Sequence, residues 1–128
     1  MLTIILSLPI LVLLLAFSDP LNGGYILRRK YGSIISSGKK RRYLLYVPHS
    51  YDPHKPVPLV ISLHGYKDYP ARQMRKSGWN RLAEEEGFIV VYPWGSGIPF
   101  GWKYYDYLDP SKNPTPDIIF ISDLIDQL

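Results

Sequence analysis

The stretch that decides the fold runs Pro58-Leu59-Val60-Ile61-Ser62-Leu63-His64-Gly65-Tyr66. Its apolar residues follow two closely spaced prolines and predict a strand that is buried on both faces inside a parallel sheet. The strand ends abruptly at His64-Gly65. A glycine directly after such a strand marks a point where the backbone turns sharply or where another group approaches it closely.

Length and composition narrow the class of protein. The chain has 128 residues, of which 46% are apolar and 14% aromatic, which argues against disorder and allows one domain with a core. It has no cysteine, which excludes disulfides, thiolate metal sites and a cysteine nucleophile. Neither a metal-ligand spacing of His, Asp and Glu nor a glycine-rich phosphate loop occurs, so we expect no metal and no cofactor.

The net charge of +4 is unevenly distributed along the chain. The positive residues gather in Arg28-Arg29-Lys30 and in Lys39-Lys40-Arg41-Arg42. Runs of this kind can contact phosphates or anionic lipid. Because the second run follows Ser36-Ser37-Gly38 and precedes a predicted strand, we interpret it as a solvated hairpin turn and expect no nucleic-acid partner.

Residues 1–18 form an apolar N-terminal segment with more than one interpretation. The apolar run is shorter than the roughly 20 residues of a membrane span, and Ala16-Phe17-Ser18 suits signal cleavage before Asp19. No Lys or Arg precedes the run, whereas Arg28-Arg29-Lys30 follows it, which suits an uncleaved anchor instead. We favour a signal peptide and secretion over a membrane anchor, with a buried core helix as the third option. A membrane partner is expected only if the segment stays uncleaved.

Local patterns beyond residue 30 alternate between strand and helix. Residues 31–37 and 41–47 predict two strands joined by a turn, and residues 88–92 predict another buried strand. Residues 71–86 have a helical pattern in which Ser77 caps a second piece after a break at Gly78, and Gly87 ends the helix. Two buried strands flanking one helical segment predict a βαβ unit, and therefore an α/β fold.

A last helix is predicted to begin at Thr115-Pro116-Asp117. Threonine is expected to cap it, proline needs no N–H partner there, and aspartate suits the positive end of the helix dipole. The predicted apolar face comprises Ile118, Ile121, Leu124, Ile125 and Leu128. The helix reaches Leu128 with neither glycine nor a cation in its last turn, which we interpret as a truncation or early stop. We therefore expect poor solubility of the isolated chain.

The segment from Trp94 to Asn113 is a long loop rich in glycine, proline and aromatic residues. Its aromatic residues are Trp94, Phe100, Trp102, Tyr104, Tyr105 and Tyr107. Loops of this length are usually functional or disordered, and aromatic residues disfavour disorder. The rings either form a wall that contacts sugar or phenol groups beside a cleft, or they cover the sheet and fill a core layer.

Five segments taken together resemble one family. They are residues 42–48, 58–65, 77–80, 87–93 and 117–128, and their order and spacing are similar to the N-terminal half of a secreted polyhydroxybutyrate depolymerase or feruloyl/acetylxylan esterase. The resemblance covers residues 30–128. It implies a partial α/β-hydrolase domain over residues 31–128, after a linker at 19–30: a β-hairpin, a βαβ unit and a further helix. Implied substrates are an ester-bearing polymer or a small ester.

The resemblance also implies roles for individual residues. His64 and Gly65 would shape a turn from which the backbone N–H of Tyr66 points at a developing oxyanion, while the side chain of His64 serves this turn or merely packs in it. Trp94 and Trp102 would contact substrate. The catalytic serine, acid and base of the family are not in this chain. No Gly-x-Ser-x-Gly occurs, and Gly95-Ser96-Gly97 lacks the spacing.

Two histidines and a second hypothesis complete the expectations. His49 and His54 lie in a proline-rich loop and are interpreted as surface residues rather than as a catalytic base. Whether this chain is itself an enzyme stays open, since its family consists of serine ester hydrolases. The alternative is a catalytically inactive remnant, secreted or membrane-anchored, that binds a polymer or a protein partner.

Overall fold

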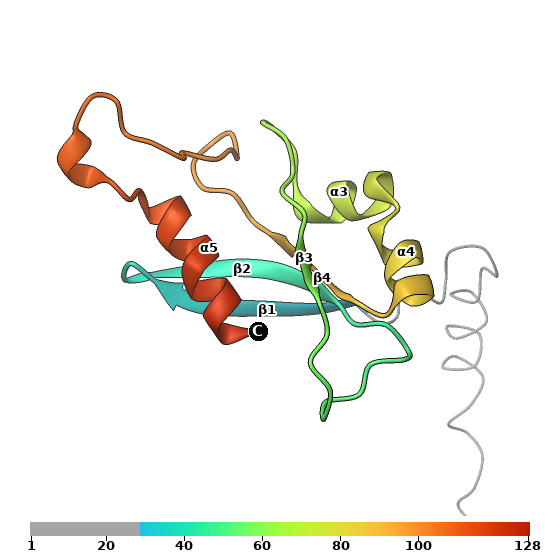
Figure 1. The fold of residues 1–128 in the computed structure, drawn as a ribbon. Helices are drawn as coiled ribbons and strands as arrows, with labels where there is room; N and C mark the ends of the chain where they lie inside the picture. Colours follow the sequence, from blue (N-terminus) through green and yellow to red (C-terminus); the bar gives the residue numbers. More distant parts are fainter. Residues whose placement is uncertain (1–28) are drawn as a thin grey trace, which may run out of the picture.

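The computed structural model describes residues 29–128 as a mixed sheet with helices on both of its faces (Figure 1). The predicted signal peptide or anchor, and nearly all of the predicted linker, lie outside the described residues. Within residues 29–128, no helix is long and apolar enough to span a membrane. The elements in chain order are β1 (Arg29–Ser36), β2 (Lys39–Tyr46), β3 (Leu59–Ile61), α3 (Pro70–Ser77), α4 (Trp79–Glu86), β4 (Ile89–Pro93), η1 (Pro110–Lys112) and α5 (Pro116–Gln127).

The sheet has the strand order β1-β2-β4-β3. β1 and β2 form an antiparallel hairpin, β2 pairs antiparallel with β4, and β3 pairs parallel with β4. The two central residues of the hairpin turn, Ser37 and Gly38, have φ values of 49° and 72°. Positive φ at both positions is typical of the turn that matches the twist of paired strands. The predicted hairpin, the βαβ unit and the α/β class are confirmed.

The prediction for the first apolar strand is partly wrong. β3 covers only Leu59–Ile61, and its three residues are half-buried rather than fully buried. Val60 packs against one core cluster, while Leu59 and Ile61 pack against the other, so both faces of the strand do contact the core. The residual exposure follows from its position, because among the described strands β3 pairs with β4 alone.

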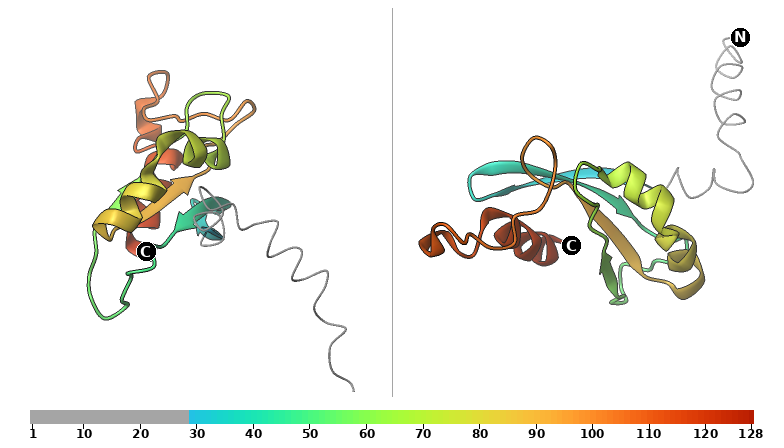
Figure 2. Two further views of the ribbon diagram at one scale, coloured as in Figure 1. Left: turned by 90° about the vertical axis from the view of Figure 1, so that its right-hand side faces the viewer. Right: turned by 90° about the horizontal axis from the view of Figure 1, so that it is seen from above.

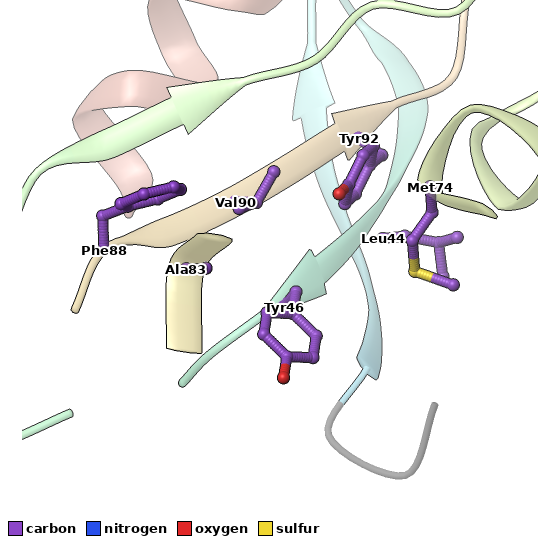
Figure 3. Close-up of a cluster of buried hydrophobic side chains, with 7 residues drawn as sticks. All are labelled: Leu44, Tyr46, Met74, Ala83, Phe88, Val90 and Tyr92. Atoms are coloured by element: carbon purple, nitrogen blue, oxygen red, sulfur yellow. The ribbon is translucent and has the colours of Figure 1, made fainter. Parts of the chain in front are cut away.

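Two clusters of buried side chains lie on opposite faces of the sheet. The larger one lies between the sheet and the α3–α4 pair (Figure 3), and it comprises Leu44, Tyr46, Met74, Ala83, Phe88, Val90 and Tyr92. The smaller cluster comprises Val91, Phe120 and Leu124 and lies under α5, on the other side of the sheet (Figure 2). Successive residues of β4 point to opposite faces of the sheet, and so Val90 and Val91 belong to different clusters.

The helical segment between β3 and β4 divides at Gly78 as predicted, but Gly78 and not Ser77 occupies the N-cap position of the second helix. α3 ends at Gly78 and α4 ends at Gly87, and both glycines have left-handed φ. The hydroxyl of Ser77 accepts the N–H of Trp79 at 3.4 Å, at the start of the second helix. Burial raises the pKa of Tyr92 to about 12, so its hydroxyl stays protonated and donates to the buried Asn80 side chain at 2.7 Å.

α5 begins where predicted, but its contacts with the sheet differ from the predicted face. Of the predicted face, Leu124 is buried and Ile121 packs against the smaller cluster, whereas Ile118, Ile125 and Leu128 are exposed. Phe120, which the prediction left out, is fully buried. Thr115 occupies the N-cap position, yet its hydroxyl donates to the carbonyl of Lys103 instead of capping the helix. The rotation of α5 is therefore set by contacts that hydrophobic periodicity does not report.

The contact that orients α5 is a buried ion pair between Arg41 and Asp117. One guanidinium nitrogen of Arg41 lies 2.8 Å from the Asp117 carboxylate, and both side chains are almost fully buried. The guanidinium also stacks over the ring of Phe120 at 4.1 Å and donates to the carbonyl of Trp94. The interpretation of this basic run as a solvated turn is wrong for Arg41, because its side chain points inward to a carboxylate from another element.

The second oxygen of Asp117 extends this ion pair to the long loop. It accepts hydrogen bonds from the hydroxyl of Ser96 at 2.9 Å and from the N–H of Lys103 at 2.8 Å. One carboxylate thus joins α5, the hairpin and both ends of the 96–103 segment. Aspartate at this position had been expected for its favourable charge at the helix N-terminus, and its larger role comes from tertiary contacts.

We predict that Asp117→Ala lowers the free energy of unfolding by about 3–5 kcal/mol, because it leaves the buried guanidinium of Arg41 without a charged partner. Urea unfolding followed by tryptophan fluorescence measures the change. Asp126→Ala on the exposed side of the same helix is the control and should change stability by less than about 0.5 kcal/mol. A loss below about 1 kcal/mol for Asp117→Ala would contradict the importance of this pair.

Glu84 fastens the loop that follows β2 to α4. Its carboxylate accepts the hydroxyl of Tyr46 at 2.6 Å and also the backbone N–H of His49 at 3.2 Å. The His49 ring lies 3.1 Å away and is itself largely exposed, as predicted for a surface histidine. Burial alone would raise the pKa of the Glu84 carboxyl, but these hydrogen bonds outweigh burial and hold the pKa below its ordinary value.

Because the carboxyl of Glu84 has a lower pKa in the folded state than in the unfolded state, its ionised form stabilises the fold. This stabilisation is complete above the unfolded-state pKa of about 4.3 and is lost as the pH falls through the folded-state pKa. We expect Glu84→Gln to lose about 1–2 kcal/mol at neutral pH and to show a shallower loss of stability between about pH 5 and pH 3. Urea unfolding across that range tests this. Glu85→Gln is the control, because the exposed carboxylate of Glu85 pairs with Arg81 at 4.0 Å, and this variant should keep the wild-type pH profile. Matching profiles for both variants would refute the role of Glu84.

Candidate functional site

Two loops meet where the parallel strands β3 and β4 end. The first spans residues 62–69 and leads into α3, and the second begins at Trp94 after β4. The N–H of Ser62 still bonds to the carbonyl of Val91 at 2.9 Å, which carries the strand pairing to the edge of the first loop. In open α/β sheets, ligands bind outside the carboxyl ends of the strands, and this edge is therefore where a site is expected.

His64 joins the two loops through both nitrogens of its ring. Its side chain is buried, and Nε2 accepts the N–H of Gly95 at 2.9 Å. Because that nitrogen accepts, we assign the ring proton to Nδ1, which donates to the carbonyl of Gly65 at 2.8 Å. The side chain of His64 therefore serves the turn and the neighbouring loop, with neither nitrogen left for proton transfer.

The turn over residues 65–68 is fixed by hydrogen bonds and by one left-handed residue. The N–H of Asp68 donates to the carbonyl of Gly65 at 3.1 Å, and Lys67 has a φ of 60°. Asp68 accepts the ammonium of Lys76 at 2.7 Å and the N–H of Tyr69 at 2.9 Å, and these bonds hold the pKa of its carboxyl below the ordinary value. The turn is thereby fastened to α3.

Tyr66 occupies the tip of this turn. Its ring is 71% exposed and lies against Gly101, while its neighbour Lys67 donates a backbone N–H to the carbonyl of Phe100 at 2.9 Å. Within residues 29–128, the N–H of Tyr66 makes no hydrogen bond to another protein group. A backbone donor on a fixed turn and without a partner is what an oxyanion hole requires.

The structure leaves no room for a side chain at Gly95 but leaves room for one at Gly65. A Cβ at Gly95 would lie 2.3 Å from the carbonyl oxygen of Gly101 and 3.1 Å from the ring of His64. Ser96 and Gly101 exchange backbone hydrogen bonds at 2.9 and 3.0 Å, which explains this close approach. At Gly65, by contrast, a Cβ would meet nothing within 4 Å and φ is not left-handed, so the space beside this residue is open to another molecule.

Trp94 and Trp102, the predicted substrate contacts, are both half-buried. Trp94 packs against the larger core cluster and carries the guanidinium of Arg42 over its ring at 4.7 Å. Trp102 packs against the smaller cluster and donates its indole N–H to the carbonyl of His64 at 2.9 Å. Their contact with a substrate stays a prediction. The more exposed rings of this loop are those of Tyr104, Tyr105 and Tyr107, with Phe100 39% exposed.

Other candidate groups do not assemble into catalytic machinery. Ser96 donates its hydroxyl to Asp117, and both ring nitrogens of His64 are occupied by Gly95 and Gly65. His54 is exposed in the loop that precedes β3. In the part of the chain that the structure describes, no three His, Asp or Glu side chains gather as metal ligands. Sequence reasoning missed the role of Gly95, whose signal is its position two residues after the end of β4.

No family model matches the chain. Among curated proteins, the bifunctional acetylxylan esterase/xylanase XynS20E of Neocallimastix patriciarum is 34% identical over 91 residues, which cover 71% of this chain and 12% of that protein. A solved thermostable esterase has a TM-score of 0.60 and 20% identity, covering 81% of this chain and 31% of its own. A solved ferulic acid esterase has a TM-score of 0.51 and 20% identity, and the match covers 77% of this chain and 43% of that structure.

The strand order and the β3–α3–α4–β4 unit define an α/β-hydrolase fold, which these solved structures share. Within that fold, the chain belongs to the esterases and resembles the N-terminal part of their domain. It spans about an eighth of the curated relative and less than half of each of the two solved esterases.

We predict that Gly95→Ala destabilises the chain by about 1–3 kcal/mol, because the new methyl group overlaps the backbone of Gly101. Gly65→Ala is the matched control and should leave stability unchanged within about 0.5 kcal/mol, or raise it slightly through the unfolded state. Urea unfolding of both variants beside wild type measures the difference. Equal stability of the two variants would mean that the contact between the loops is looser than described.

Proposed function

We propose that this chain forms part of a secreted serine esterase that cleaves carboxylic esters carried by a polymer, and that Tyr66 supplies one oxyanion donor. The observation that carries the proposal is the unpartnered N–H of Tyr66 on a turn fixed by His64 and Asp68. The open space beside Gly65 allows an ester carbonyl to approach that N–H.

The chemistry divides between this chain and residues outside it. A serine hydroxyl adds to the ester carbonyl, a base takes its proton, and the carbonyl oxygen becomes an oxyanion that the N–H of Tyr66 stabilises. The serine, base and acid are contributed by parts of the esterase that this sequence does not contain. His64 is a positioning residue, since it holds the turn and transfers no proton.

The substrate class follows from the relatives. The curated relative is an acetylxylan esterase joined to a xylanase, and one structural neighbour is a ferulic acid esterase. Both names point to acyl groups on plant polysaccharide, and we therefore favour such esters over polyhydroxyalkanoate. Secretion suits an insoluble polymeric substrate, and the apolar residues 1–18 are consistent with export.

The decisive experiment replaces the donor. In the protein encoded by the whole reading frame, Tyr66→Pro removes the N–H at a turn position that favours proline, and should lower kcat for p-nitrophenyl acetate about 100- to 1,000-fold. Tyr66→Ala keeps the N–H and should lose far less activity. If Tyr66→Pro and Tyr66→Ala lose kcat equally, the loss comes from the missing ring of Tyr66 and not from its N–H.

The same assay separates the enzyme from the alternative of a non-catalytic remnant. The chain of 128 residues should be inactive by itself, and the longer protein should turn over ester with sensitivity to serine-directed reagents. Inactivity of both would favour a remnant that binds a polymer. Turnover by the short chain alone would show that a nucleophile lies within it, contrary to the proposal.

A further inference from the structure

The long loop carries an exposed cluster of tyrosines that the fold itself does not use. Tyr104, Tyr105 and Tyr107 are 68%, 43% and 73% exposed. The ring of Tyr107 contacts both others, at 6.4 Å from Tyr104 and 4.8 Å from Tyr105 between ring centroids. Rings that serve a core are buried, as Tyr46 and Tyr92 are, and this cluster therefore needs a different explanation.

The backbone beneath the cluster is rigidly held. The buried carboxylate of Asp106 accepts the N–H groups of Leu108 and Asp109 at 3.1 and 3.0 Å. Asn113 bonds to both the N–H and the carbonyl of Asp106. A surface whose backbone is already ordered loses little conformational entropy on binding, which favours a role as a preformed contact surface.

The charge around the cluster disfavours a polyanionic partner. Lys103 lies 2.6 Å from Asp106, and Lys112 lies 3.2 Å from Asp109, so these cations of the segment are paired with its own carboxylates. Nucleic acid and anionic membrane require unpaired positive charge beside the aromatic rings. Tyrosine combines an apolar face with a hydroxyl, which suits a neutral partner that has both C–H faces and hydroxyl groups.

The cluster also lies near the candidate donor. The ring of Tyr66 lies against Gly101, and Tyr104 follows Gly101 by three residues. A fully extended chain spans at most roughly 11 Å over three residues, so the cluster begins within that distance of Gly101, against which the ring of Tyr66 lies. A polymer resting on the tyrosines can therefore reach the candidate site with a neighbouring unit.

We propose that Tyr104, Tyr105 and Tyr107 form a platform on which a neutral β-linked polysaccharide chain packs its sugar faces, holding acylated units near Tyr66. The choice of polysaccharide rests on the proposed function, while the platform rests on exposure, rigidity and charge. Sugar C–H groups pack on the phenol faces, and sugar hydroxyls bond to the tyrosine hydroxyls at the rim.

The test uses the whole chain and deacetylated xylan, which carries no ester and so reports binding without hydrolysis. In affinity electrophoresis, we expect Tyr104→Ala/Tyr105→Ala/Tyr107→Ala to weaken xylan binding at least tenfold. Tyr31→Ala is the matched control, because Tyr31 is 65% exposed on the hairpin, outside the cluster, and should bind like wild type. Tyr107→Phe keeps the ring and should stay within threefold of wild type.

Circular dichroism and urea unfolding verify that each variant is folded. If the triple variant does not fold, xylan binding by the single variant Tyr107→Ala tests the platform instead. Absence of xylan binding by wild type, or equal binding by the cluster variant, would overturn the platform. Binding to polyhydroxybutyrate film but not to xylan would overturn the assignment to polysaccharide.

The platform and the proposed function can fail separately. If the protein from the whole reading frame cleaves no ester while the chain binds xylan through these tyrosines, only the esterase assignment falls. If ester turnover depends on the N–H of Tyr66 while the cluster variant binds xylan unchanged, only the platform falls.

Discussion

The ion pair between Arg41 and Asp117 joins the β1–β2 hairpin, α5 and the long loop after β4. A buried guanidinium is tolerated only with a charged partner, so the hairpin and α5 must meet at this point. The same carboxylate also holds Ser96 and Lys103, and thereby both ends of one loop. Packing of Phe120 under the guanidinium then follows from the rotation that the pair imposes on α5.

A second set of hydrogen bonds, made by the ring of His64, holds the segment that enters that loop. His64 accepts the N–H of Gly95 and donates to Gly65, so the turn after β3 and the segment after β4 hold one another in position. The closeness of this contact depends on the absence of a side chain at Gly95. Among residues 29–128, no group accepts the N–H of Tyr66, because the neighbours of this rigid turn satisfy one another. Preorganisation of this kind is what makes a backbone donor effective.

The sequence by itself determined the order and type of the elements. Apolar runs bounded by prolines and glycines predicted β3 and β4, and left-handed glycines at 78 and 87 ended the helices where expected. The His64-Gly65 pair pointed to the turn, and the resemblance pointed to an esterase. These features are local, since strand and helix periods and the freedom of glycine depend on neighbours in the chain.

Only the tertiary structure decided which side chains are used and how. Arg41 belongs to a basic run whose pattern suggests solvent, and its burial depends on a carboxylate 76 positions away. Hydrophobic periodicity placed Ile121 and Leu124 of α5 correctly but not Ile118, Ile125 and Leu128, because the buried ion pair of Asp117 also sets the rotation of the helix. The rings of the long loop divided between core and surface, Trp102 inward and Tyr104 outward. Such choices require the packing of distant segments, which no local pattern encodes.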